Sequence, residues 1–294
     1  MKKICEKLLV LIIVAANCIG IMAGCGASIS SMTTISDNPA VKDRLEQIKE
    51  KGVLTVASAD NKPFGYIDSQ TNQFTGIDAD IITEIARRLG IDKVEMKLVP
   101  FKYLLNELNT DKDIDIIASG LYVTEERKKE VLFTNVWYKE PEAIVTLKAS
   151  EFNSKEDLKN AVVGAESGTV FVELIQKWKN DGLVKDVRIY QSQPDLILAV
   201  ATNEIDASIL DSASASYLVS RYKNLNFKIF TPYKPELPGI VAAAVKKSDN
   251  SFADVINKKI DEMKEDGTLI EILKKHGLNE SNFVSVKEGH ISGQ

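Results

Sequence analysis

The order of apolar and polar positions divides the chain into short apolar runs separated by amphipathic segments. Runs of strand length occur at 53–57, 94–99, 113–118, 162–164 and 205–210. Between them, apolar residues recur at helical spacing, most clearly in the set Ile77, Ile81, Ile82, Ile85 and Leu89. Strands that alternate with helices predict an α/β fold with open, mostly parallel sheets.

The same alternation starts again near Ala143, which predicts a second sheet ending near residue 230. The run 239–245 indicates a return to the first sheet, and a long helix with a break at Asp266-Gly267 is expected over 250–275. In both halves, polar residues follow a strand directly at the start of a helix. Ligands collect at such carboxyl edges of open α/β sheets.

The N-terminus carries the features of a secretion signal. Lys2, Lys3 and Lys7 precede an apolar run of 14 residues, Leu8 to Ile21, which is short for a membrane span. It ends in Met-Ala-Gly-Cys25, which resembles a bacterial lipobox with an acylated Cys25 as the new N-terminus. Ordinary cleavage with a free Cys25 and a retained signal anchor are the alternatives. The polar segment 25–38 is expected to be a flexible tether.

The cysteine content and net charge limit the classes of molecule that could bind the chain. Cys5 and Cys18 lie in the predicted signal peptide 1–24, so a lipidated chain would keep no free thiol and no disulfide. Removal of the signal takes away three lysines and one glutamate and changes the net charge from −5 to −7. That charge disfavours nucleic acid or an anionic membrane surface as a partner. The lipid alone is therefore expected to provide the membrane link.

The segment 113–127 contains the first candidate site. An apolar strand ends at Ser119-Gly120, and Thr124 is a favourable N-cap for a helix over 124–131. The backbone N–H groups from Gly120 to Tyr122 and the guanidinium of Arg127 suit a carboxylate. A structural arginine that pairs with a nearby acid is the alternative.

The second half supplies complementary groups. Gly168-Thr169 opens a helix and offers further donors to the same anion, and Asp211 ends the apolar run Ile209-Leu210. Asp211 would accept an ammonium, or cap the helix over 212–220. A carboxylate clamp opposite an ammonium acceptor describes a trap for a zwitterion such as an amino acid.

Aromatic residues are candidates for the walls of this trap. Phe64, Tyr66 and Tyr122 could contact a side chain or a cation. For Phe64, a place in the hydrophobic core is the alternative.

Catalytic and metal-binding patterns are sparse. The two histidines, His276 and His290, are not in a triad-like setting, and the chain has no H-E-x-x-H, C-x-x-C or phosphate-loop pattern. The carboxylate pairs Asp78/Asp80 and Asp113/Asp115 are interpreted as helix caps or solvated edges. We therefore expect no catalytic residue, no metal and no cofactor.

Several segments, in this order, resemble the extracytoplasmic solute-binding proteins of polar amino-acid ABC transporters. The similarity covers roughly residues 45–285. It rests on Leu-Glu-Gln-Ile-Lys-Glu-Lys-Gly-Val-Leu (45–54), Asp-Asn-Lys-Pro-Phe-Gly-Tyr (60–66), Gly-Ile-Asp-Ala-Asp-Ile (76–81), residues 115–127, Gly-Ala-Glu-Ser-Gly-Thr (164–169) and Asn-Glu-Ile-Asp-Ala (203–207), which leads to Asp211.

The resemblance implies a type II periplasmic-binding-protein fold with two lobes that close on the ligand. Lobe 1 would comprise 39–142 and 236–285, lobe 2 would comprise 143–235, and 286–294 would be a tail. Hinge strands are expected near 140–146 and 232–240.

The family's motifs also imply residue roles. Arg127 would grip the α-carboxylate, with Gly168 and Thr169 in the second lobe, and Asp211 would take the α-amino group. Phe64 is the aromatic of the Pro-Phe motif. The expected protein is a monomeric, lipid-anchored receptor that passes a zwitterion to a membrane permease outside the cytoplasm.

Two positions depart from the family pattern. Tyr122 replaces a small hydroxyl residue, and Asn61 replaces a stacking aromatic residue. Such a tyrosine is similar to that of binders of ectoine-like or betaine-like compatible solutes, whereas Asp211 favours a primary amine. A dehydratase on the same fold, with Glu166 as the acid or base, is a further alternative. A sensory domain is another, although no membrane-spanning segment follows Ser285.

Overall fold

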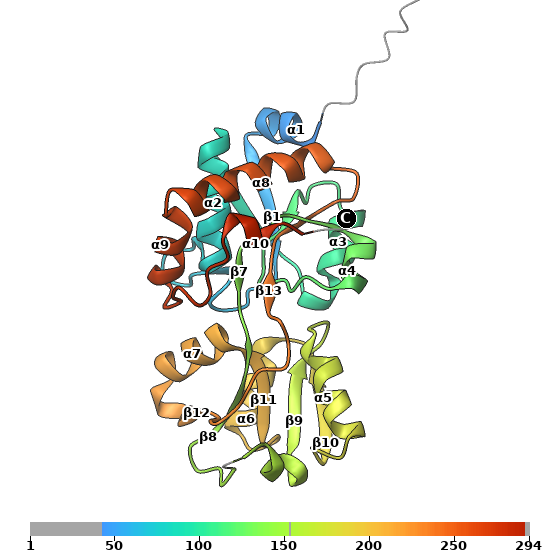
Figure 1. Cartoon of the computed structure of the whole chain (residues 1–294), viewed down its shortest axis with the longest axis vertical. Helices are drawn as coiled ribbons and strands as arrows, with labels where there is room; N and C mark the ends of the chain where they lie inside the picture. The colour runs from blue at the N-terminus through green and yellow to red at the C-terminus, as the bar shows by residue number, and fades with distance from the viewer. Residues whose placement is uncertain (1–42, 153, 292–294) are drawn as a thin grey trace, which may run out of the picture. The chain divides into compact units, whose positions relative to one another are not determined.

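Two five-stranded sheets organise the chain in the computed structural model, which describes residues 43–152 and 154–291. Figure 1 shows one sheet in the upper lobe and the other in the lower lobe, with two extended segments between them. All described residues belong to one compact unit, Lys42–Gln294. The predicted signal, the tether and Cys25 lie outside the described residues.

The first sheet has the order β4-β1-β5-β14-β6. Its strands are β1 (Val53–Ser58), β4 (Lys93–Leu98), β5 (Ile116–Ile117), β6 (Leu132–Phe133) and β14 (Ala244–Val245). β1 runs parallel to β4 and β5, whereas β14 runs antiparallel to β5 and β6. Because β14 opposes both β5 and β6, the other four strands all run in one direction, and the expectation of a mostly parallel sheet is confirmed; β14 is the exception because it returns from the other lobe.

The second sheet has the order β10-β9-β11-β8-β12. Its strands are β8 (Glu142–Leu147), β9 (Val162–Glu166), β10 (Asp186–Tyr190), β11 (Ala207–Asp211) and β12 (Phe227–Ile229). β10, β9 and β11 are parallel, β8 pairs antiparallel with β11, and β12 pairs antiparallel with β8, so that β8 alone opposes the other four strands. Both sheets are thus mixed, and in each the parallel part carries the strand-to-helix turns.

Helices cover both sheets (Figure 1). The first lobe has α1 (Arg44–Lys51), α2 (Ile77–Leu89), η1 (Phe101–Tyr103), α3 (Leu104–Thr110), α4 (Glu125–Glu130), α8 (Asn250–Glu265), α9 (Thr268–Lys275) and α10 (Val286–Gly289), with a small hairpin of β2 (Tyr66–Ile67) and β3 (Phe74–Thr75). The second lobe has η2 (Lys155–Asn160), α5 (Phe171–Asn180), α6 (Gln193–Ala201), α7 (Ser212–Arg221) and η3 (Lys223–Leu225).

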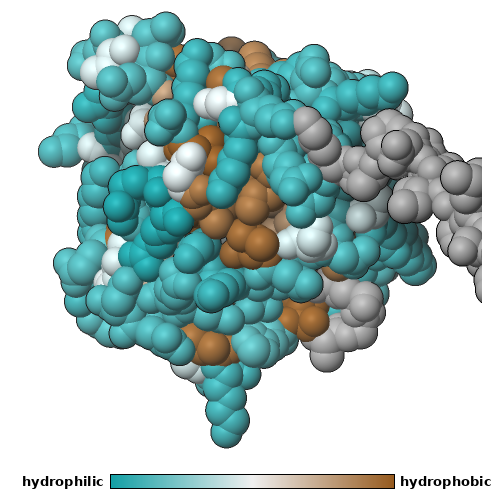
Figure 2. Space-filling view, turned by 90° about the horizontal axis from the view of Figure 1, so that it is seen from above, coloured by the Kyte–Doolittle hydropathy of each residue, from teal (hydrophilic) through white to brown (hydrophobic). Residues whose placement is uncertain are grey.

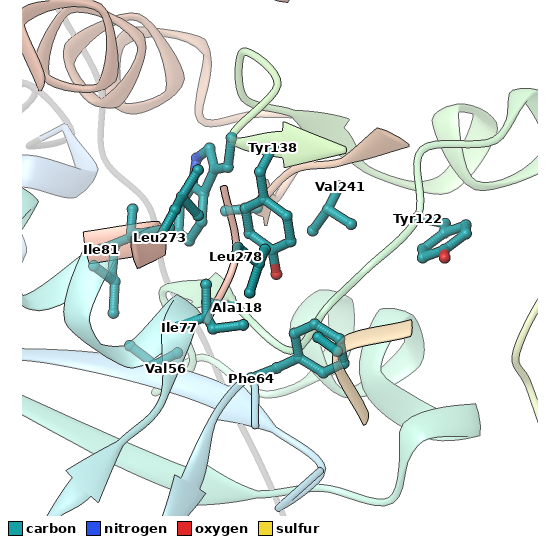
Figure 3. Close-up of a cluster of buried hydrophobic side chains, with 14 of the residues drawn as sticks. Val56, Phe64, Ile77, Ile81, Ala118, Tyr122, Tyr138, Val241, Leu273 and Leu278 are labelled. Carbon is teal, nitrogen blue, oxygen red and sulfur yellow. The ribbon is translucent and has the colours of Figure 1, made fainter. Parts of the chain in front are cut away.

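The amphipathic pattern of α2 is confirmed. Its apolar stripe is buried, and the helix ends at Gly90 in the left-handed conformation. Figure 3 shows Ile77 and Ile81 of this helix in a cluster with Val56, Ala118 and Phe64. Figure 2 shows that the face seen from above is mainly hydrophilic, with apolar residues gathered near its middle. No helix in the described part of the chain is long and apolar enough to cross a membrane.

The two connections between the lobes run side by side. β7 (Tyr138–Lys139) pairs antiparallel with β13 (Ile240–Val241), and the N–H of Glu140 donates to the carbonyl of Gly239 at 2.6 Å. Gly239 has a φ of +59°, and a Cβ at this position would lie 2.1 Å from the carbonyl oxygen of Glu140. Glycine is therefore required where the two segments pass each other.

The C-terminal segment packs against the first lobe. It begins with α10, and the carbonyl of Gly289 accepts a hydrogen bond from the N–H of Val136 at 2.8 Å. Residues 286–291 are thus anchored to the fold, although the sequence indicated only a tail.

Candidate functional site

A pocket between the lobes brings together most of the residues that the sequence predicted for the site. Its lining includes Phe64, Ser119, Gly120, Tyr122, Arg127, Thr169 and Asp211. Gly168 borders the pocket only through its carbonyl, which accepts a hydrogen bond from Arg127. The strand-to-helix turns of the two sheets therefore face one common space.

Arg127 reaches across the pocket from α4. Its Nη1 donates to the carbonyl of Tyr122 at 2.7 Å, and its Nη2 donates to the carbonyl of Gly168 in the other lobe at 2.9 Å. The guanidinium carbon lies 5.6 Å from the centre of the Phe101 ring. Because burial disfavours the charge, the pKa of Arg127 falls to about 10, so it stays cationic at neutral pH. The two bonds occupy two of the five donors of a guanidinium.

The local sequence holds Arg127 in this position. Thr124 caps α4 as predicted, since its side chain accepts a hydrogen bond from the N–H of Arg127. The alternative of an ion-paired structural arginine does not hold, because no salt bridge of Arg127 is present among the described residues.

The turn at Gly120 has a structural role that the sequence did not indicate. The N–H of Gly120 donates to Oδ2 of Asp78 at 2.6 Å, so the proposal that this group binds an anion was wrong. Asp78 also accepts a hydrogen bond from the hydroxyl of Tyr138 at 2.6 Å. Gly120 has a φ of +63°, and a Cβ here would lie 2.8 Å from the ring of Phe64. The turn at Gly120 therefore packs directly against the ring of Phe64.

Asp211 ends β11 and faces the pocket from the second lobe. It occupies the N-cap position of α7 but makes no capping hydrogen bond with its side chain. Its pKa is raised well above the usual range by burial and then by the negative charge of Glu140. The side chain of Asp211 therefore does not cap α7, and its carboxyl instead contacts the hydroxyl of Tyr122.

Glu140 takes the capping role instead. Its Oε1 accepts hydrogen bonds from the hydroxyl of Ser212 and the N–H of Ala213, both at 2.5 Å. Its Oε2 accepts a hydrogen bond from Nδ2 of Asn282 at 3.3 Å. The side chain is fully buried, and burial raises its pKa to about 7. One carboxylate thus connects the hinge, α7 and the C-terminal segment.

Thr169 and Gly168 lie in the turn before α5. This helix begins at Phe171, two residues later than the sequence indicated. The hydroxyl of Thr169 donates to the carbonyl of Glu166 at 2.7 Å, which closes the turn. A Cβ on Gly168 would lie 2.5 Å from Cα of Lys102 in the other lobe. The lack of a side chain at this position therefore permits the close approach of the lobes.

The aromatic residues divide into two groups. Phe64 and Tyr122 line the pocket, and the Tyr122 ring packs edge-on against Phe171 with centroids 5.7 Å apart. The hydroxyl of Tyr122 donates to the carbonyl of Glu140. Tyr66 packs against Tyr217 at 6.4 Å and is not part of the pocket lining. Figure 3 shows Phe64 also packed in the hydrophobic cluster, so Phe64 belongs to both core and pocket.

Several pocket residues were missed or given other meanings at the sequence level. Phe101 and Gln193 were not singled out, yet both line the pocket. Asn61 was noted only as a departure from a pattern, and Glu166 only as a candidate base. In the structure Nδ2 of Asn61 donates to Oε2 of Glu166 at 2.9 Å across the two lobes. In the sequence, these two residues stand out only because Asn61 lies in the motif 60–66 and Glu166 lies in the motif 164–169, and nothing there indicated that they are in contact.

Two of the four paired carboxylates were misinterpreted. Asp78 and Asp115 are each about 1% exposed and are therefore neither solvated nor helix caps. Asp115 pairs with Lys51 at 2.9 Å and Arg44 at 3.4 Å. Burial raises the pKa of Asp78 to about 6, although its bonds from Gly120 and Tyr138 oppose the shift.

The histidines lie away from the pocket. His276 contacts Asp80 at 2.8 Å, and His290 lies 3.4 Å from Asp261. Neither residue lines the pocket that holds Arg127. The described residues contain no group of three or more acidic, histidine or cysteine side chains that could hold a metal.

Two α/β lobes that enclose a pocket between them, with a cation from one lobe facing an acid from the other, define a solute-binding protein. The sequence profile of the family described as bacterial extracellular solute-binding proteins, family 3, matches residues 54–279. The chain belongs to this family.

Similar proteins agree with this assignment. The L-cystine-binding protein TcyA of Bacillus subtilis is 29% identical over 94% of this chain and 97% of its own length. A probable histidine-binding protein of Campylobacter jejuni is 32% identical over 76% of this chain and 85% of its own length. The structure of an ancestral arginine-binding protein bound to arginine has a TM-score of 0.69 and 32% identity over 77% of this chain and 98% of that one.

Proposed function

We propose that the protein captures a free amino acid between its lobes and delivers it to the permease of an ABC importer. In this proposal Arg127 binds the α-carboxylate and Asp211 binds the α-ammonium. Phe64 and Tyr122 wall the pocket, and Ser119, Gly120, Gly168 and Thr169 shape its floor. The main support is that Arg127 and Asp211 come from opposite lobes and line the same pocket, but form no salt bridge with each other. A bound zwitterion would pair with both charged side chains, and charges that are buried together need such partners.

The named relatives support an amino acid as the ligand, since proteins named for binding arginine, cystine and histidine are similar to this chain over most of its length. The primary ammonium that Asp211 would accept favours an amino acid over a betaine, whose quaternary nitrogen donates no hydrogen bond. The dehydratase alternative is set aside, because the chain belongs to a family of solute-binding proteins.

Calorimetric titration of the full chain in detergent with amino acids, ectoine and glycine betaine tests the proposal. Arg127→Ala should weaken the best ligand by about 30-fold or more, the equivalent of roughly 2 kcal/mol or more for loss of one partner in a buried charge pair. Arg87→Ala removes an exposed arginine that pairs with Glu84 on α2 and should leave affinity unchanged. Equal affinities of wild type and Arg127→Ala would refute the clamp.

We also propose that lipid on Cys25 anchors the protein outside the cytoplasm and that the protein acts as a monomer. The basic n-region, the 14-residue apolar run and the Met-Ala-Gly-Cys25 sequence support the anchor. Expression of wild type and Cys25→Ser in a bacterial host with radiolabelled palmitate tests it. Label in both proteins, or in neither, would contradict acylation at this residue.

A further inference from the structure

A third charged side chain in the pocket is not used by the proposed zwitterion. Among the residues that line the pocket, Arg127, Asp211 and Glu166 carry formal charges. An α-carboxylate would match Arg127, and an α-ammonium would match Asp211. Glu166 would then remain as a carboxylate without a cation, in a site that closure removes from water.

Glu166 stands at the end of β9 and is only 5% exposed. Its carboxyl accepts hydrogen bonds from Nδ2 of Asn61, at 2.9 Å, and from the backbone N–H of Gln193, which are both neutral groups. Asp195 and Asp211 act on the same region with negative charge, and burial is the main reason why the pKa of Glu166 rises to about 7. An ionised carboxylate in this position is poorly compensated by its neighbours.

Asn61 adds a second acceptor at the same place. It is 5% exposed, and its Oδ1 is buried with no hydrogen-bond partner in the described part of the structure. Buried polar atoms are rarely left unpaired, because burial removes the hydrogen bonds that water would otherwise supply. The site thus offers a carboxylate and a free amide oxygen, both acceptors, one from each lobe.

We propose that Glu166 and Asn61 form the subsite for the side chain of the ligand, and that this side chain is cationic. A guanidinium or ammonium would supply the missing positive charge to Glu166 and the missing donor to Oδ1 of Asn61. Because the two residues belong to different lobes, such a side chain also adds contacts that exist only in the closed form. This inference rests on the proposed function for the orientation of the ligand.

A matched pair of ligands tests the charge requirement. Arginine and citrulline have nearly the same shape, but citrulline replaces the charged guanidinium by a neutral ureido group. In calorimetric titrations of the full chain in detergent, we expect arginine, lysine or ornithine to bind at least about 30-fold more tightly than citrulline, glutamine and norleucine. This comparison uses the wild-type protein and does not depend on the folding of any variant.

Glu166→Gln tests the residue. Glutamine keeps an acceptor for Asn61 but removes the charge, so the variant should lose at least about 10-fold in affinity for the cationic ligand and less than 2-fold for citrulline. Glu156→Gln is the control, since Glu156 is exposed on η2 in the same lobe and is not part of the pocket lining. It should change neither affinity.

The outcomes separate the two proposals. Binding of neutral amino acids that depends on Arg127, with no preference for cationic ones, would overturn the subsite and leave the proposed function intact. The same would follow if Glu166→Gln weakened arginine and citrulline equally, as a purely structural role requires. If no amino acid binds, the proposed function and the subsite are both wrong.

Discussion

The hinge carboxylate Glu140 should make the folded state less stable as pH rises, and replacement by glutamine should remove this effect. Burial raises its pKa from 4.5 to about 7 in the folded protein. Below pH 4.5 the group is protonated in both folded and unfolded chains and costs nothing. Between pH 4.5 and 7 the folded protein holds the proton that the unfolded chain releases, so stability falls as pH rises.

The size of this effect follows from the shift. A difference of about 2.5 pKa units corresponds to on the order of 3 kcal/mol, fully present above about pH 7. Glutamine keeps one acceptor for the N–H of Ala213 but places donors toward Asn282, which changes stability by an amount that does not depend on pH. The prediction therefore concerns how the difference in unfolding free energy between wild type and Glu140→Gln changes with pH, and not the size of that difference at any one pH.

Urea unfolding between pH 4.5 and 8 measures this difference, with tryptophan fluorescence as the signal. Trp137 and Trp178 are fully buried, one in each lobe, so the signal reports on both. Relative to wild type, Glu140→Gln should gain about 3 kcal/mol between pH 4.5 and 8. Glu84→Gln is the control, because bonds from Arg87 and Arg88 lower the pKa of Glu84 to about 2, so Glu84 changes stability only below about pH 4.5 and this variant should run parallel to wild type over the measured range. Parallel profiles for wild type and Glu140→Gln would refute the argument.

Two further substitutions test the packing of the first lobe and the hinge by urea unfolding. Gly239→Ala should cost at least about 2 kcal/mol, because its Cβ would meet the carbonyl of Glu140 at 2.1 Å. Gly52→Ala is the control: its Cβ would have nothing within 4 Å, so it should cost only about 1 kcal/mol for the left-handed φ. Equal costs for the two variants would contradict the close approach at Gly239. Asp115→Asn should cost about 1–2 kcal/mol, since it removes the charge that pairs with Lys51 and Arg44, of which Lys51 is 39% exposed and can be solvated instead; a change below about 0.5 kcal/mol would show that these ion pairs contribute little.

The local pattern of the sequence predicted the long elements well. The stripe of α2, the end of that helix at Gly90 and the break between α8 and α9 at Asp266-Gly267 follow from spacing and from glycine positions. These features depend on residues that are neighbours in the chain, where periodicity and cap chemistry act directly. The positions of Arg127 and Asp211 in one pocket followed from similar turns in both sheets.

Contacts between distant segments could not be predicted in the same way. The run 239–245 divides into β13 and β14 because its first part pairs with β7 and its second part pairs with the first sheet. The burial of Asp115 depends on Lys51 and Arg44, more than 60 residues away. The partnership of Asn61 with Glu166 spans 105 positions and two lobes. No local pattern encodes such a pairing.

Glu140 and Asp211 have different roles at the start of α7, which explains why the pocket holds an acid that makes no capping hydrogen bond. Asp211 stands at the N-cap position of α7, where an aspartate normally accepts a bond from the second or third N–H of the helix. That N–H, on Ala213, instead donates to Glu140 in the hinge. Glu140 therefore satisfies the start of α7, and Asp211 remains available to a ligand. Because Glu140 also contacts Asn282, the carboxylate that caps α7 is itself held by the C-terminal segment, and no helix N–H competes with a ligand for Asp211.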